Sequence, residues 1–140
     1  MYLKANTLFF YICLVCLSTT LISCSKNDQE AKDLYIQADN LSKNGEYGKA
    51  KELLKKAVEK SPDFSEGLYA LGDLYYRQSN LDTAIQLLEK SIEIAPDNFD
   101  ALTKLANSYN KKEKFDKAIT NYEAAIKLRP DSILNYNNLA

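Results

Sequence analysis

The fold is decided by residues 68–96, which read LYALGDLYYRQSNLDTAIQLLEKSIEIAP, and by the similar residues 102–130, LTKLANSYNKKEKFDKAITNYEAAIKLRP. Each stretch ends in a proline. The three prolines of the 140-residue chain, Pro62, Pro96 and Pro130, recur at a constant interval of 34 positions. A fixed period of this length indicates a protein built from structural repeats.

Apolar residues within one period follow helical spacing. Leu68, Leu71 and Tyr75 stand at i, i+3 and i+7, and the same spacing begins again at Ile85. This spacing is typical of one face of a helix. The polar residues 78–80 interrupt it, so each unit is predicted to form two helices of about 13–14 residues joined by a tight turn. The proline lacks an N–H and ends the second helix.

An acidic residue follows each proline and is predicted to begin the next helix. Asp63 precedes Glu66 by three residues, and Asp97 precedes Asp100 by the same interval. This is the spacing of an N-cap and its partner at the third helical position. We therefore expect Asp63 and Asp97 to be N-caps.

The repeated pattern resembles the tetratricopeptide repeat, in which small and large residues alternate at fixed places over 34 positions. The second unit carries the pattern most fully, with Leu68, Leu71, Gly72, Tyr75, Ala84, Leu88, Ser91 and Pro96. The resemblance implies an all-α fold, a solenoid of three helix-turn-helix repeats plus the start of a fourth in a right-handed superhelix. The repeats would span residues 31–64, 65–98 and 99–132, and residues 133–140 would be the first helix of the partial fourth.

The segment 1–24 differs in composition from the rest of the chain. After Lys4, residues 8–22 hold no charge, as in a secretory signal peptide. The motif Leu21-Ile22-Ser23-Cys24 that follows resembles the lipobox of bacterial lipoproteins. The resemblance implies a cleaved leader over residues 1–23, lipid on Cys24 and a polar tether over residues 24–30. It places the protein in the bacterial cell envelope, at the periplasmic or outward-facing leaflet of the outer membrane. An uncleaved anchor and an ordinary cleavage site are the alternatives.

The composition argues against several kinds of catalytic and binding site. The chain has no histidine, so it lacks a Ser-His or Cys-His nucleophile pair and a His-based zinc site. Beyond Cys24 it holds 17 basic and 19 acidic residues, without the surplus of basic residues that nucleic-acid binding requires.

Asp39 and Asp73 could pair as catalytic carboxylates. The better interpretation is a ladder of polar residues at equivalent repeat positions, completed by Asn107. We expect no enzyme activity, no cofactor and no metal.

By resemblance, the first helix of each repeat would line a concave groove that binds a peptide or protein. Tyrosine and amide side chains suit such recognition, since they offer contact area and directed hydrogen bonds. The predicted groove residues are Tyr35, Asp39, Tyr69, Asp73, Tyr76, Arg77, Lys104, Asn107, Asn110 and Asn137. The specialised groove that clamps a C-terminal carboxylate would need basic and amide residues where this chain has Tyr35, Asp39, Ala70, Asp100 and Lys104.

The sequence thus favours a membrane-tethered interaction scaffold. An adaptor or sensor portion of a longer protein, with its active domain beyond residue 140, and a structural spacer without a ligand are the alternatives. Gln37, Lys51 and Lys60 replace apolar residues of the later units, so the first unit is predicted to be a polar cap. At the other end, we expect the natural chain to continue past Ala140 or a partner to cover the last unit.

Overall fold

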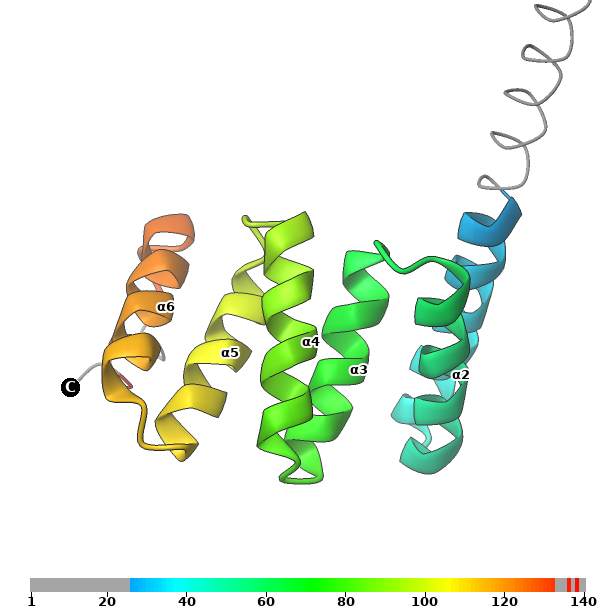
Figure 1. Cartoon of the computed structure of the whole chain (residues 1–140), viewed down its shortest axis with the longest axis horizontal. Coiled ribbons are helices and arrows are strands. Elements are labelled where there is room, and N and C mark those ends of the chain that lie inside the picture. Colours follow the sequence, from blue (N-terminus) through cyan, green and yellow to red (C-terminus); the bar gives the residue numbers. More distant parts are fainter. Residues whose placement is uncertain (1–25, 133–135, 137, 139–140) are drawn as a thin grey trace, which may run out of the picture.

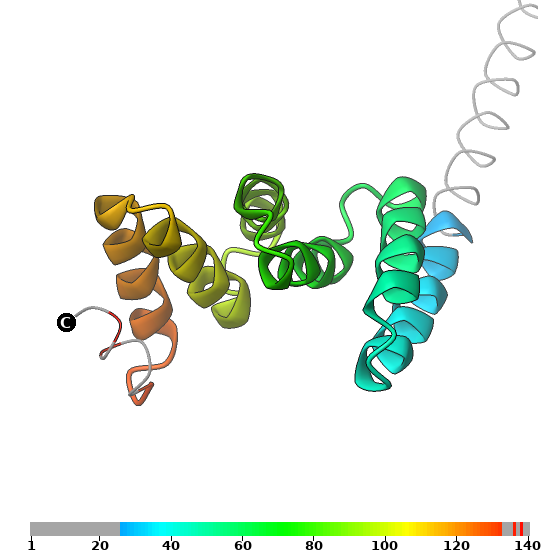
Figure 2. The same ribbon diagram turned by 90° about the horizontal axis from the view of Figure 1, so that it is seen from below.

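The chain folds into an array of helical hairpins. The computed structural model describes residues 26–132, 136 and 138. A first helix over residues 26–43 is followed by α2 (Tyr47–Lys60), α3 (Ser65–Arg77), α4 (Leu81–Ile94), α5 (Phe99–Lys111) and α6 (Phe115–Leu128). The helices lie side by side in chain order (Figure 1). Successive hairpins are turned relative to one another (Figure 2), and the prediction of three helix-turn-helix repeats is confirmed.

Small residues allow the two helices of a repeat to approach closely. Ala38 and Ala106 are fully buried at the repeat position of Gly72, and Ala50 and Ala84 are fully buried on the facing helices. A Cβ atom on Gly72 would lie 3.0 Å from Leu88 Cγ. The helices are therefore in contact along backbone as well as side chains, which explains the small residues in each period.

The turn inside each hairpin has the same backbone path. Gly45, Ser79 and Glu113, which stand at equivalent positions of successive repeats, have φ angles of 80°, 60° and 58°. In each turn the next residue donates its N–H to a carbonyl five residues earlier; the donor in the second turn is Asn80, 3.0 Å from Tyr75 O. A left-handed residue lets the chain reverse after a helix and favours glycine, yet only the first repeat has one.

The predicted N-caps are wrong by one residue. The N-caps of α3 and α5 are Phe64 and Asn98, and Asn98 Oδ1 accepts a hydrogen bond from Ala101 N at 3.0 Å. The residue after each proline lies instead inside a turn, closed in the first case by Phe64 N donating to Ser61 O at 3.1 Å. The proline occupies the second place of that turn, so Asp63 and Asp97 occupy the third, before the helix.

The first helix begins earlier than the repeat boundary predicts. Residues 26–30, expected in the polar tether, are helical and held to the end of the first hairpin. Ser61 Oγ donates to Asp28 Oδ1 at 2.7 Å, and Lys60 Nζ lies 2.7 Å from Glu30 Oε2. Residues 1–25, which include the predicted leader and Cys24, lie outside the described residues. Among those that are described, no helix combines the length and apolar character needed to cross a membrane.

The core lies between and within the repeats. One buried cluster joins α4, α5 and α6, and another joins the first helix, α2 and α3. Tyr109 and Tyr122 are 4% and 1% exposed and belong to the first of these clusters. Their hydroxyls donate to Glu89 and, at 2.5 Å, to Asn107 Oδ1. Buried phenols normally find such partners.

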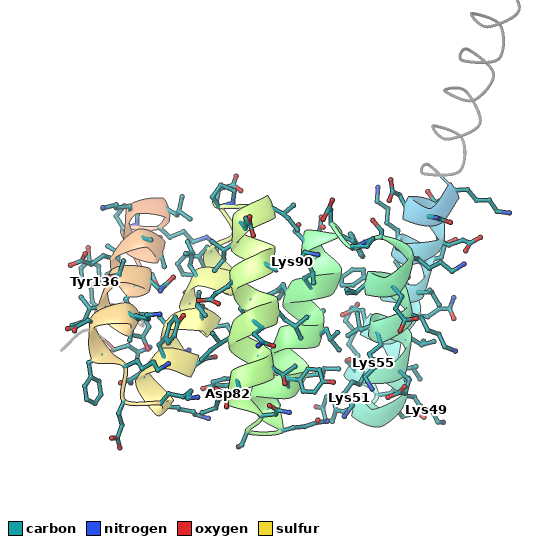
Figure 3. All side chains as sticks on the ribbon, in the orientation of Figure 1. Lys49, Lys51, Lys55, Asp82, Lys90 and Tyr136 are labelled. Atoms are coloured by element: carbon teal, nitrogen blue, oxygen red, sulfur yellow. The ribbon has the colours of Figure 1, made fainter. Side chains whose placement is uncertain are left out.

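Lys51 does not cap the outer face of the first repeat. It extends from α2 on the side of α3 (Figure 3), where Nζ donates to Gln78 Oε1 at 3.0 Å and lies 5.4 Å from the centre of the Tyr75 ring. A lysine can serve at this interface because its stem packs while its ammonium faces a ring. At the other end of the array, Phe115 and Ile119 are 56% and 41% exposed on α6.

Candidate functional site

A cavity of about 290 Å³ opens between the first helix and α3. These are the first helices of two neighbouring repeats, as expected for the predicted groove. The lining combines rings, carboxylates and cations with two leucines; its residues are Tyr35, Asp39, Ser42, Lys43, Tyr47, Leu54, Tyr69, Ala70, Asp73, Leu74 and Arg77. The structure thus brings five of the predicted groove residues together in one place, namely Tyr35, Asp39, Tyr69, Asp73 and Arg77.

Packing outside the cavity fixes one of its aromatic walls. The ring of Phe64 meets the ring of Tyr35 edge-on, with centroids 5.5 Å apart and planes at 87°. Phe64 can take this place because Gly67 has no side chain. A Cβ atom there would lie 2.7 Å from Phe64 Cδ1. The edge-on geometry is a favoured arrangement of two rings, so Phe64 and Gly67 together position Tyr35.

The phenols of Tyr35 and Tyr69 sit in surroundings that resist ionisation. Burial, reinforced by Asp73 and Asp100, raises the pKa of Tyr69 to about 12. Burial, followed by the negative charges of Asp39 and Glu66, also raises the pKa of Tyr35. Both hydroxyls therefore stay protonated over the physiological range and can donate hydrogen bonds to a ligand.

Each aspartate of the groove pairs with a cation four residues later. Lys43 Nζ lies 2.5 Å from Asp39 Oδ2, and Arg77 Nε donates to Asp73 Oδ2 at 2.6 Å. The two pairs differ in exposure, since the side chain of Asp39 is 44% exposed and that of Asp73 only 16%. The first pair is therefore loosely held, because exposed ion pairs contribute little.

Asp73 has a further partner from the next repeat. Lys104 Nζ lies 2.6 Å from Asp73 Oδ1 as an ion pair outside the directions of a regular hydrogen bond. Burial of Asp73 disfavours its charge, but the contacts with Lys104 and Arg77 outweigh burial and lower its pKa. The carboxylate therefore stays ionised near neutral pH and would not serve as a proton donor there.

Tyr76 lies between cations in the second half of the groove. The ammonium of Lys104 is 4.9 Å from its ring centre, and that of Lys111 is 4.2 Å away. Ring faces attract cations, so the ring and Asp73 together hold Lys104 in place. Lys104 and Tyr76 thus lie against each other where the second repeat meets the third.

The remaining predicted groove residues have separate places. Asn107 Oδ1 accepts from Tyr122 and, at 3.3 Å, from Asn138 Nδ2. Asn110 is exposed at the end of α5. Asn137 lies outside the described residues. In the part of the chain that the structure describes, no three acidic, cysteine or histidine side chains form a group that could hold a metal.

The cavity also has lining residues outside the predicted groove list, among them Ser42, Lys43 and Tyr47. Ser42 and Lys43 close the first helix, and Tyr47 begins α2 with the guanidinium of Arg77 6.0 Å from its ring centre. Tyr47 belongs to a second helix, and the prediction considered only first helices. The available signal was a tyrosine where the later repeats carry Leu81 and Phe115.

Comparison with known families agrees with this architecture. The tetratricopeptide repeat family matches residues 35–99 and, separately, residues 99–132. The chain therefore belongs to the tetratricopeptide repeat family. No curated protein matches the chain in a sequence comparison.

Solved structures with this fold include proteins of varied sequence. The chain is similar to the first TPR of Spaghetti (RPAP3) bound to the HSP90 peptide SRMEEVD, with a TM-score of 0.77, 19% identity, and coverage of 80% of this chain and 89% of that one. It is similar to MamA, with a TM-score of 0.75, 29% identity, and coverage of 81% and 67%. It is also similar to the Arabidopsis OM64 TPR domain, with a TM-score of 0.75, 13% identity, and coverage of 80% and 93%.

Proposed function

We propose that the protein is a non-enzymatic scaffold that binds a peptide segment of a partner protein in the groove of its first helices. The cavity between the first helix and α3 carries this proposal, because it joins tyrosine walls, an apolar floor and charged side chains in one concave site. Such sites fix a ligand through a few polar groups placed among apolar ones. The solved Spaghetti repeat domain supports the proposal as an example of this fold with a bound peptide.

The ligand differs in chemistry from the acidic peptide named for that relative. At the positions of a carboxylate clamp, Asp39 and Asp100 carry negative charge and Ala70 none. Lys104, the single cation of the set, is already occupied by Asp73. A free C-terminal carboxylate would therefore meet like charge without an available basic partner.

The groove is tested by selection from a random dodecapeptide library on the purified chain. Replacing Tyr69 by alanine removes one wall, and we expect affinity for selected peptides to fall about tenfold, as for truncation of an aromatic contact. Phe115→Ala is the matched control, since it removes an exposed ring on α6 away from the groove. Peptides that bind both variants equally, or a failure to select any peptide, would contradict the proposal.

We further propose that lipid on Cys24 tethers the scaffold to a bacterial membrane, as the outer membrane component of an envelope assembly. The leader and its lipobox-like end support this proposal. Two or three acyl chains would hold the protein firmly, whereas one holds only marginally. Mass spectrometry of the mature amino terminus should find an acylated Cys24, and the Cys24→Ala chain should leave the membrane fraction. An unmodified terminus at any other residue would contradict the tether.

A further inference from the structure

The cavity exists because two groove positions hold small side chains at one junction and large ones at the next. Between the second and third repeats, the ammonium of Lys104 lies against the Tyr76 ring and beside Asp73. The residues 34 positions earlier are Ser42 and Ala70, and both line the cavity. The empty space thus corresponds to the place that a lysine and a ring occupy one repeat later.

Among the residues that the structure describes, Asp39 has no cross-repeat partner like those of Asp73 and Asn107. Asp73 pairs with Lys104, and Asn107 accepts from Asn138; each partner stands 31 residues further along the chain. The residue 31 positions after Asp39 is Ala70, whose methyl group cannot pair with a carboxylate. In this respect Asp39 is the incomplete member of the polar ladder.

The present partner of Asp39 is easily displaced. Lys43 belongs to the same helix turn, and its side chain is 70% exposed. It can turn into water without uncovering a buried charge. The other charges of the cavity do not oppose an incoming cation strongly, because Arg77 is engaged by Asp73, which also holds Lys104.

The rings beside Asp39 favour a positive charge. Tyr35 and Tyr69 both line the cavity, and a cation is attracted to the face of a tyrosine ring. Carboxylates act on both phenols, Asp39 and Glu66 on Tyr35, and Asp73 and Asp100 on Tyr69. Lys104 shows the same combination, an ammonium beside a carboxylate and a tyrosine ring, realised by the protein's own side chain.

The geometry points to a lysine side chain of the partner as the occupant of this cavity, with its ammonium at Asp39 in the place that Lys104 takes at Asp73. The inference rests on the proposed function, since it names the side chain that the groove recognises. The stem of the lysine would lie against Ala70 and the rings, where a longer residue at position 70 would collide with it.

The test uses the dodecapeptides selected on the purified chain, with each lysine replaced in turn by norleucine, which keeps the stem and removes the ammonium. One such replacement should weaken binding about tenfold, as expected for loss of one ion pair in a partly enclosed site. On the Asp39→Asn protein the same replacement should change affinity less than about twofold. The Ala70→Lys protein, which fills the cavity with its own ammonium, should bind the lysine peptides about tenfold more weakly.

Gln86→Lys is the matched control, because it adds the same charge at an exposed position of α4. It should bind the peptides as the unchanged protein does. Thermal unfolding identifies any variant that fails to fold. If Ala70→Lys does not fold, the norleucine comparison on the Asp39→Asn protein tests the inference by itself. Groove-binding peptides that tolerate norleucine at every lysine, or that contain none, would overturn the inference and leave the proposed function standing. Failure to select any peptide would overturn both.

Discussion

Asp73 and Lys104 join the second repeat to the third through an ion pair of 2.6 Å, with side chains only 16% and 23% exposed. Partial burial makes the pair sensitive to the loss of either member, because the remaining charge would be left without its partner. Asp73 also lines the cavity, so this pair stands at the edge of the proposed binding site.

Replacing Lys104 by methionine keeps the stem and removes the ammonium. We expect the free energy of unfolding to fall by about 1–3 kcal/mol, because Asp73 then keeps only Arg77 in a partly buried place. Urea unfolding followed by circular dichroism measures the change. Lys90→Met is the control, since Lys90 lies 3.9 Å from a mostly exposed Asp63. Equal losses in the two variants would show that the cross-repeat pair is unimportant.

Asp73 predicts a loss of stability in acid. Its pKa is lowered in the folded protein. In acid, this carboxylate therefore binds fewer protons in the folded state than in the unfolded state. The stability that it contributes is present above the unfolded-state pKa of about 3.9 and disappears as the pH falls through the lower folded-state pKa. Unfolding free energies measured from pH 7 to pH 2 should therefore fall less for Asp73→Asn than for the unchanged protein. Parallel curves would contradict this assignment.

Substitutions to and from glycine in the three hairpin turns should have opposite effects on stability. Ser79 and Glu113 have positive φ angles without being glycine. Ser79→Gly and Glu113→Gly should each raise the free energy of unfolding by about 0.5–1 kcal/mol, because glycine adopts this conformation without strain. Gly45→Ala should lower it. Gly48→Ala is the control within α2, where a new Cβ meets open space, and it should be stabilising. Thermal unfolding that ranks Gly45→Ala with Gly48→Ala would refute the argument.

Replacing Gly67, which lies outside the cavity, should change the position of Tyr35 in the cavity wall. The alanine variant places a Cβ atom where Phe64 now lies, so the ring must leave its edge-on contact with Tyr35. We expect loss of the ring-to-ring NMR contacts between Phe64 and Tyr35 and a several-fold weaker affinity for selected peptides. Gly48→Ala should leave both unchanged. Retained ring contacts in the Gly67→Ala protein would show that Phe64 does not depend on this glycine.

The helical array could be predicted from sequence because its signals are local and repeated. Prolines at a constant interval, together with small residues at constant places, indicate both the hairpins and their stacking. The N-caps could not be placed to the residue, because a proline-led turn and a capped helix begin with similar residue types. Only the backbone shows that Asp63 lies in the turn and that Phe64 is the N-cap of α3.

The cavity was harder to predict than the groove that contains it. Its existence depends on Ala70 and Ser42, which carry little signal as single residues. They become informative when the larger Lys104 and Tyr76 are seen to touch at the next junction. Tyr47 was missed for a related reason, since its approach to the groove depends on how α2 packs against the neighbouring repeat.

The early start of the first helix has a consequence for the proposed tether. Lys26 is already helical, so in sequence a single residue, Ser25, stands between Cys24 and the first described helical residue. A lipid on Cys24 would therefore hold the first helix close to the membrane surface. Asp39 follows Lys26 by 13 positions, which at about 1.5 Å per helical residue is no more than about 20 Å along the helix. A partner bound in the groove of the tethered protein would thus lie close to the lipid headgroups.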